Sequence, residues 1–91
     1  MNTVVATVEA RESTHGPFEM TSRIAQELKG VMRCYDWYSL TDCQREALEM
    51  MCSKVARILN GNSSFGDHWH DIAGYAQLAE QEVIQSRGQD S

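Results

Sequence analysis

The sequence predicts an all-α protein, a small helical bundle built on an antiparallel helical hairpin. The main observation is that residues 41–79 read as two amphipathic helices joined by a short turn rich in glycine, asparagine and serine. A hydrophobic content of 42% with a single proline favours a folded helical protein over a disordered chain. No stretch shows the alternation of apolar and polar residues that predicts a strand.

The first helix of this hairpin is expected over residues 42–59. Thr41 and Gln44 fit a T-x-x-Q capping box at its start, and Asn60 and Gly61 offer a left-handed stop at its end. Its predicted core stripe consists of Leu48, Met51, Cys52, Val55, Ile58 and Leu59. The opposite, polar face contains Glu46, Glu49, Met50, Ser53 and Arg57.

The second helix is expected from Asp67 to Ser86, because an acidic residue at a helix start complements the helix dipole. Its predicted core stripe is Trp69, Ile72, Ala73, Ala76, Ala79 and Val83. Asp67, Asp71, Gly74, Tyr75 and Leu78 share another face, within about 100° of one another. A glycine inside a helix costs about 0.5–1 kcal/mol relative to alanine. We therefore expect another helix, another subunit or a ligand against this face.

The rest of the chain completes one domain over residues 1–91. We expect a short helix over residues 4–12, a turn over 13–17, a helix over 18–33 and frayed ends at about 1–3 and 87–91. The core side of the 18–33 helix is predicted to contain Ile24, Ala25, Leu28, Val31 and Met32. The connector 34–39 is aromatic, with Tyr35, Trp37 and Tyr38, and these rings either plug one end of the bundle or offer a stacking surface for a base.

Charge and composition narrow the class of partner. Thirteen acidic against eight basic residues give a net charge of −5, and the scattered basic residues argue against duplex nucleic acid. The absence of a long apolar run or a signal-peptide pattern argues against a membrane segment and predicts a cytoplasmic protein.

The three cysteines lack the spacing of a zinc site and are expected to be reduced packing residues. Apolar Met50 and Leu78 on polar faces predict a homodimer or larger closed assembly.

Carboxylates are the candidates for chemistry. Glu46 and Glu49 are spaced i, i+3 on one helix, and Asp67 and Asp71 are spaced i, i+4 on the next. They are either the solvated faces of two helices or a site for Mg²⁺ or Mn²⁺, which prefer oxygen ligands.

The cations and histidines near these carboxylates extend the candidate set. Lys54 and Arg57 are candidates for binding phosphate, and Tyr75 is a further ligand-binding candidate. His70 either joins Asp67 and Asp71 or has an exposed ring, and His68 points to the opposite side of the helix.

Four motifs resemble a family of small phage and prophage proteins of unassigned function. They are R-x-x-x-H-G-x-F at residues 11–18, Q-R-E-A-L-E-M-M at 44–51, K-V-A-R-I-L-N-G at 54–61 and D-H-W-H-D-I-A-G-Y-A at 67–76. That family is in turn remotely similar to the MazG-like, all-α nucleoside triphosphate pyrophosphohydrolases, in which E-x-x-E on one helix and E/D-x-x-D on the next bind Mg²⁺. Glu46 to Glu49 matches the first motif, whereas Asp67 and Asp71 depart from the second by being four residues apart.

The resemblance implies two hypotheses. In the first, the protein is a Mg²⁺-dependent pyrophosphohydrolase in which Glu46, Glu49 and Asp71 hold metal and Asp67 and Asp71 act in catalysis. Lys54 and Arg57 would then neutralise phosphate charge. In the second, a phage-type protein in the host cytoplasm binds a nucleotide-type ligand without turning it over, as an anti-defence protein that sequesters an immune signal would. A third hypothesis, an adaptor for a host protein, follows from the face containing Gly74, Tyr75 and Leu78.

Overall fold

The computed structural model describes residues 17–90, which fold into helices only. They are α2 (Phe18–Arg33), α3 (Asp42–Asn60) and α4 (Gly66–Asp90). The predicted all-α class and the antiparallel hairpin of α3 and α4 are confirmed. The helix expected over residues 4–12 and the frayed residues 1–3 lie outside the described residues.

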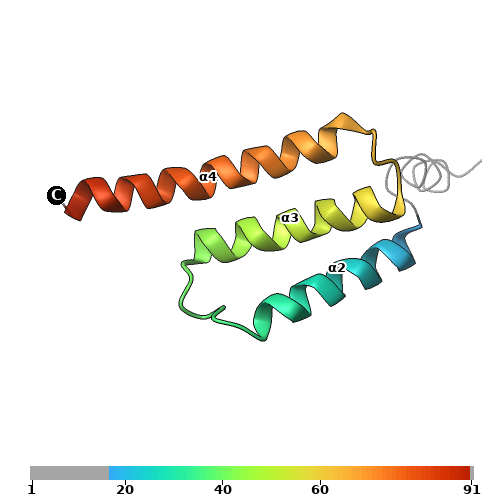
Figure 1. Cartoon of the computed structure of the whole chain (residues 1–91), viewed down its shortest axis with the longest axis horizontal. Helices are drawn as coiled ribbons and strands as arrows, with labels where there is room; N and C mark the ends of the chain where they lie inside the picture. The colour runs from blue at the N-terminus through green and yellow to red at the C-terminus, as the bar shows by residue number, and fades with distance from the viewer. Residues whose placement is uncertain (1–16, 91) are drawn as a thin grey trace, which may run out of the picture.

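The three described helices lie side by side with α3 in the middle (Figure 1). α3 packs against both α2 and α4, while α2 and α4 make no contact with each other within the described residues. The arrangement is therefore one layer of helices, in which α3 is covered on two sides and each outer helix has one packed side.

The start of α3 is fixed by the predicted capping box. The Gln44 N–H donates to the Thr41 Oγ1 at 3.1 Å, and the Thr41 N–H donates to the Gln44 Oε1 at 3.0 Å. The Thr41 hydroxyl also donates to the Glu82 Oε1 at 2.6 Å, which ties this helix start to α4. The cap therefore orders both the helix and the hairpin.

The end of α3 differs from the prediction. Gly61 has φ −126° and ψ −130°, so the expected left-handed stop is wrong. Asn60 remains in the helix, and its side-chain amide donates to the Pro17 carbonyl and the Thr21 Oγ1, both at 3.2 Å. Contacts with the start of α2 thus take the place of a left-handed cap.

The core is small and is made chiefly of small residues. Ala25, Trp37, Ala47 and Ala56 are the buried apolar side chains of the described chain. The stripe predicted for α3 is largely half-buried, and Leu59 is exposed, so that part of the prediction is wrong. Because α3 packs on two sides, its closest approaches fall at alanines instead of at one broad apolar stripe.

The packed face of α4 is rotated from the predicted one. Ile72, Ala79 and Val83 are half-buried as expected, but Trp69, Ala73 and Ala76 are exposed. His68, with 1% of its surface exposed, occupies the inner side instead and lies against Phe65, with ring centroids 4.9 Å apart. The Trp69 indole N–H donates to the Ser63 carbonyl at 2.8 Å, so this ring lies over the turn and not in the core.

α2 and the aromatic connector agree with the prediction in part. α2 has the predicted bounds, and Ala25 is buried, but Val31 is exposed. In the connector only Trp37 is buried and plugs one end of the helix layer, while Tyr35 and Tyr38 are exposed.

α4 continues to Asp90, four residues beyond the expected end. Within residues 17–90 no helix has both the length and the apolar character that crossing a membrane requires.

Candidate functional site

A groove between α2 and α3 gathers the residues best suited to bind an anion. Its volume is about 190 Å³. One face of α2 supplies one wall and two side chains of α3 supply the other. The lining residues are Phe18, Thr21, Ser22, Ala25, Gln26, Lys29, Ser53 and Arg57. Their i, i+4 and i, i+3 spacing brings them onto facing sides of neighbouring helices.

Two cations lie in this groove, Lys29 from α2 and Arg57 from α3. Both side chains are half-buried, and neither forms an ion pair with a carboxylate in the described part of the chain. Two positive charges on one groove repel each other, and an anion bound between them would relieve that repulsion. The groove is thus electrostatically suited to a phosphate or carboxylate group.

Cys52 shows that the charge of Lys29 reaches α3. Burial raises the pKa of the Cys52 thiol above its ordinary value, and the nearby Lys29 ammonium partly offsets that rise. All three cysteines are free thiols, but only Cys43 and Cys52 are half-buried as expected of packing residues, whereas Cys34 is exposed, so that part of the prediction is wrong. The Cys52 Sγ lies 3.7 Å from the Met32 Sδ. Cys52 is therefore a packing residue that lies close enough to Lys29 to feel its charge.

The remaining groove residues offer a ring and polar contacts. The Phe18 side chain is 75% exposed at the first turn of α2, where it is free to stack on a planar group. The Ser22 and Ser53 hydroxyls donate to the carbonyls of Phe18 and Glu49 in their own helices, at 2.7 and 3.3 Å. In this groove the side chains that carry a positive charge are therefore Lys29 and Arg57.

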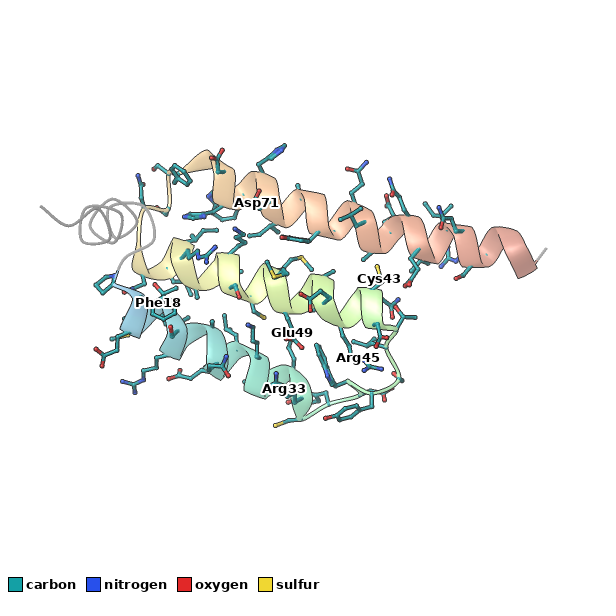
Figure 2. The ribbon with its side chains drawn as sticks, turned by 180° about the vertical axis from the view of Figure 1, so that it is seen from behind. Phe18, Arg33, Cys43, Arg45, Glu49 and Asp71 are labelled. Atoms are coloured by element: carbon teal, nitrogen blue, oxygen red, sulfur yellow. The ribbon has the colours of Figure 1, made fainter. Side chains whose placement is uncertain are left out.

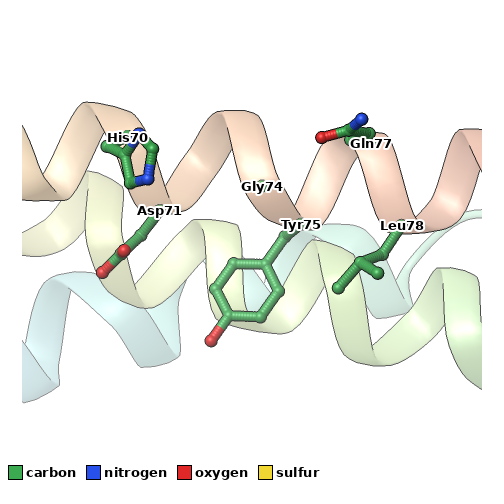
Figure 3. Close-up of a pocket in the computed structure, with 6 residues that line it drawn as sticks. All are labelled: His70, Asp71, Gly74, Tyr75, Gln77 and Leu78. Carbon is green, nitrogen blue, oxygen red and sulfur yellow. The ribbon is translucent and has the colours of Figure 1, made fainter.

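A second, shallow depression of about 340 Å³ lies on α4 alone. Figure 3 shows Gly74 between two rows of side chains, with His70 and Gln77 on one side and Asp71, Tyr75 and Leu78 on the other. Four of the five residues of the face singled out in the sequence line it. The fifth, Asp67, is exposed and outside the lining set.

Lys54 and Asp71, from neighbouring helices, form an ion pair. The Lys54 Nζ lies 2.9 Å from the Asp71 Oδ2, and the side chains are 13% and 40% exposed. The hydrogen bond from Lys54 is the main cause that holds the pKa of Asp71 below its ordinary value. Desolvation opposes it, and the charge of the Lys54 ammonium adds a further, smaller lowering. Lys54 is thus engaged by a carboxylate of the same chain.

The three predicted metal-binding carboxylates lie apart. Glu49 faces α2, where its Oε1 lies 4.0 Å from the Arg33 Nη2, whereas Asp71 lies on the α4 side of α3 (Figure 2). Glu46 is exposed. Within residues 17–90, no three histidine, cysteine, aspartate or glutamate side chains form a cluster suited to a metal ion. Within one chain, α3 therefore separates Glu49 from Asp71.

Sequence reasoning found Arg57 but missed Lys29, Ser22 and Phe18 as site residues. Their signal was present, because residues 18, 22, 26 and 29 follow one face of a helix. That face was overlooked because it reads as the polar side of an amphipathic helix. Only the packing of α3 against it turns it into the wall of a groove.

Comparison with protein families shows to which family the chain belongs. Residues 1–83 match the model of the family described as a domain of unknown function, DUF6378. The chain belongs to this family. Comparisons with curated proteins and with solved structures give no match. Because the match covers most of the chain, the DUF6378 domain includes the α2/α3 groove and most of α4.

Proposed function

We propose that this DUF6378 protein binds a phosphate-bearing ligand of the nucleotide type in the groove between α2 and α3. The observation that supports this most strongly is the pair Lys29 and Arg57, two half-buried cations that have no ion-pair partner within residues 17–90 and line one groove. In a chain of net charge −5, the basic side chains that form ion pairs within residues 17–90 are Arg23, Arg33, Arg45 and Lys54. Two unpaired cations in a concave site favour an anionic ligand.

The two cations differ in how they bind phosphate. The guanidinium of Arg57 presents a planar fork that binds two oxygens of one phosphate, and the ammonium of Lys29 acts as a compact charge from the opposite wall. A charge-assisted hydrogen bond contributes roughly 1.5–3 kcal/mol. Two such contacts fix a phosphate between the helices.

The position of Phe18 favours a nucleotide over a free phosphate as the ligand. Its exposed ring stands at one end of the same groove, where it can stack on a base while the cations hold the phosphate. Stacking of a base on an aromatic side chain contributes roughly 1–3 kcal/mol. The resemblance to phage and prophage proteins gives such binding a biological sense, since a small protein in the host cytoplasm can sequester a nucleotide signal without hydrolysing it.

Metal-dependent pyrophosphohydrolysis is the second candidate. It is favoured by Glu46 and Glu49, which keep the E-x-x-E spacing of the MazG-like enzymes on adjacent turns of α3 and retain access to solvent. A site made of these two residues and Asp71 would need carboxylates from a second subunit, because α3 separates Glu49 from Asp71 in one chain. Binding without turnover needs no such completion.

The two functions are separated by recovering the ligand. Pure protein is incubated with a panel of nucleoside triphosphates and cyclic nucleotides, with and without Mg²⁺, then freed of unbound ligand and denatured. We expect the bound nucleotide to be released intact in both conditions. Release of a monophosphate together with pyrophosphate, only when Mg²⁺ is present, would establish the hydrolase instead.

A matched pair of variants links the recovered ligand to the groove. Arg57→Gln removes a groove cation, whereas Arg23→Gln removes an arginine on α2 that is paired with Glu27 at 3.0 Å outside the groove. The first variant should recover far less nucleotide and the second as much as the unaltered protein. Equal recovery from both variants would place the ligand elsewhere.

A further inference from the structure

We draw no further inference here: the strongest candidate, the surface patch that the connector between α2 and α3 presents through its exposed Tyr35 and Tyr38 beside Arg45, carries nothing further because nothing in the described part of the chain shows what covers it.

Discussion

Lys54 and Asp71 hold α3 and α4 together through an ion pair of 2.9 Å between Nζ and Oδ2. The pair occupies a half-covered position on the hairpin, with Lys54 more enclosed than Asp71. It changes the role expected of Lys54, which was a candidate for phosphate. An ammonium already bound to a carboxylate of its own chain is a poorer phosphate ligand than Lys29 or Arg57, which have no such partner among the described residues.

The Asp71 pair predicts a specific dependence of stability on pH. Because the folded state lowers the pKa of Asp71, the charged carboxylate stabilises the fold. That stabilisation is full above the ordinary aspartate pKa of about 3.9 and is lost as pH falls through the lower, folded value. The difference in unfolding free energy between the unaltered protein and Asp71→Asn should be constant near neutral pH and shrink in acid.

The control for this measurement is Asp67→Asn, one turn earlier on α4. Asp67 is exposed and forms no ion pair within residues 17–90. Urea unfolding followed by circular dichroism at a series of pH values should show a smaller effect for this variant. An Asp71→Asn difference that grows on acidification would contradict the direction of the pKa shift.

The cap at Thr41 predicts a loss of stability that serine can restore. Thr41→Ala removes both the acceptor for the Gln44 N–H and the donor to Glu82. We expect a cost of about 1 kcal/mol in unfolding free energy for the lost N-cap, with a further loss for the tie to α4. Thr41→Ser keeps the hydroxyl and should stay close to the unaltered protein. If both variants unfold alike, the hydroxyl contacts contribute nothing.

The burial of Ala56 predicts that a larger side chain at this position destabilises the protein. This residue is fully buried in α3, so Ala56→Leu should destabilise the protein by about 1–3 kcal/mol through overpacking. Ala76→Leu is the control, because Ala76 is exposed on the side of α4 away from Gly74. Thermal unfolding should separate the two variants clearly, and an Ala56→Leu protein as stable as the unaltered one would show that Ala56 is not tightly packed.

The carboxylates of α3 predict the response to Mg²⁺. Since Glu49 faces Arg33 and Asp71 binds Lys54, we expect Mg²⁺ to change the unfolding temperature of the unaltered protein and of Glu49→Gln equally. A ligand that binds only the folded state would raise that temperature. A rise with Mg²⁺ that disappears in Glu49→Gln would support the metal-dependent hydrolase over simple binding.

The structure could be predicted from the sequence where contacts between residues close in the chain determine it. Thr41 and Gln44 set the start of α3 as predicted, because a capping box needs only residues three apart. The sequence was insufficient where another element decides which side of a helix is covered. Trp69 was assigned to the core from its periodicity, but its indole N–H finds the Ser63 carbonyl in the turn, and His68 takes the inner position.

The candidate site was predictable to a similar extent. Arg57 could be named as a cation near the other candidate residues of its helix, but Lys29, which lines the same groove, is 28 positions away and on another helix. Only the packing of α2 on α3 brings the two to one groove. The predicted metal-binding carboxylates are instead kept apart by the packing of the helices. A spacing that matches a known motif does not determine which side of α3 each carboxylate faces.

The proposed ligand site is tested most directly by isothermal titration calorimetry with the nucleotide recovered from the panel. Lys29→Gln and Arg57→Gln should each weaken binding at least about tenfold, as expected from the loss of a charge-assisted hydrogen bond. Arg23→Gln, which changes an exposed arginine of α2 outside the groove, should bind like the unaltered protein. Unchanged affinity in both Lys29→Gln and Arg57→Gln would contradict the account.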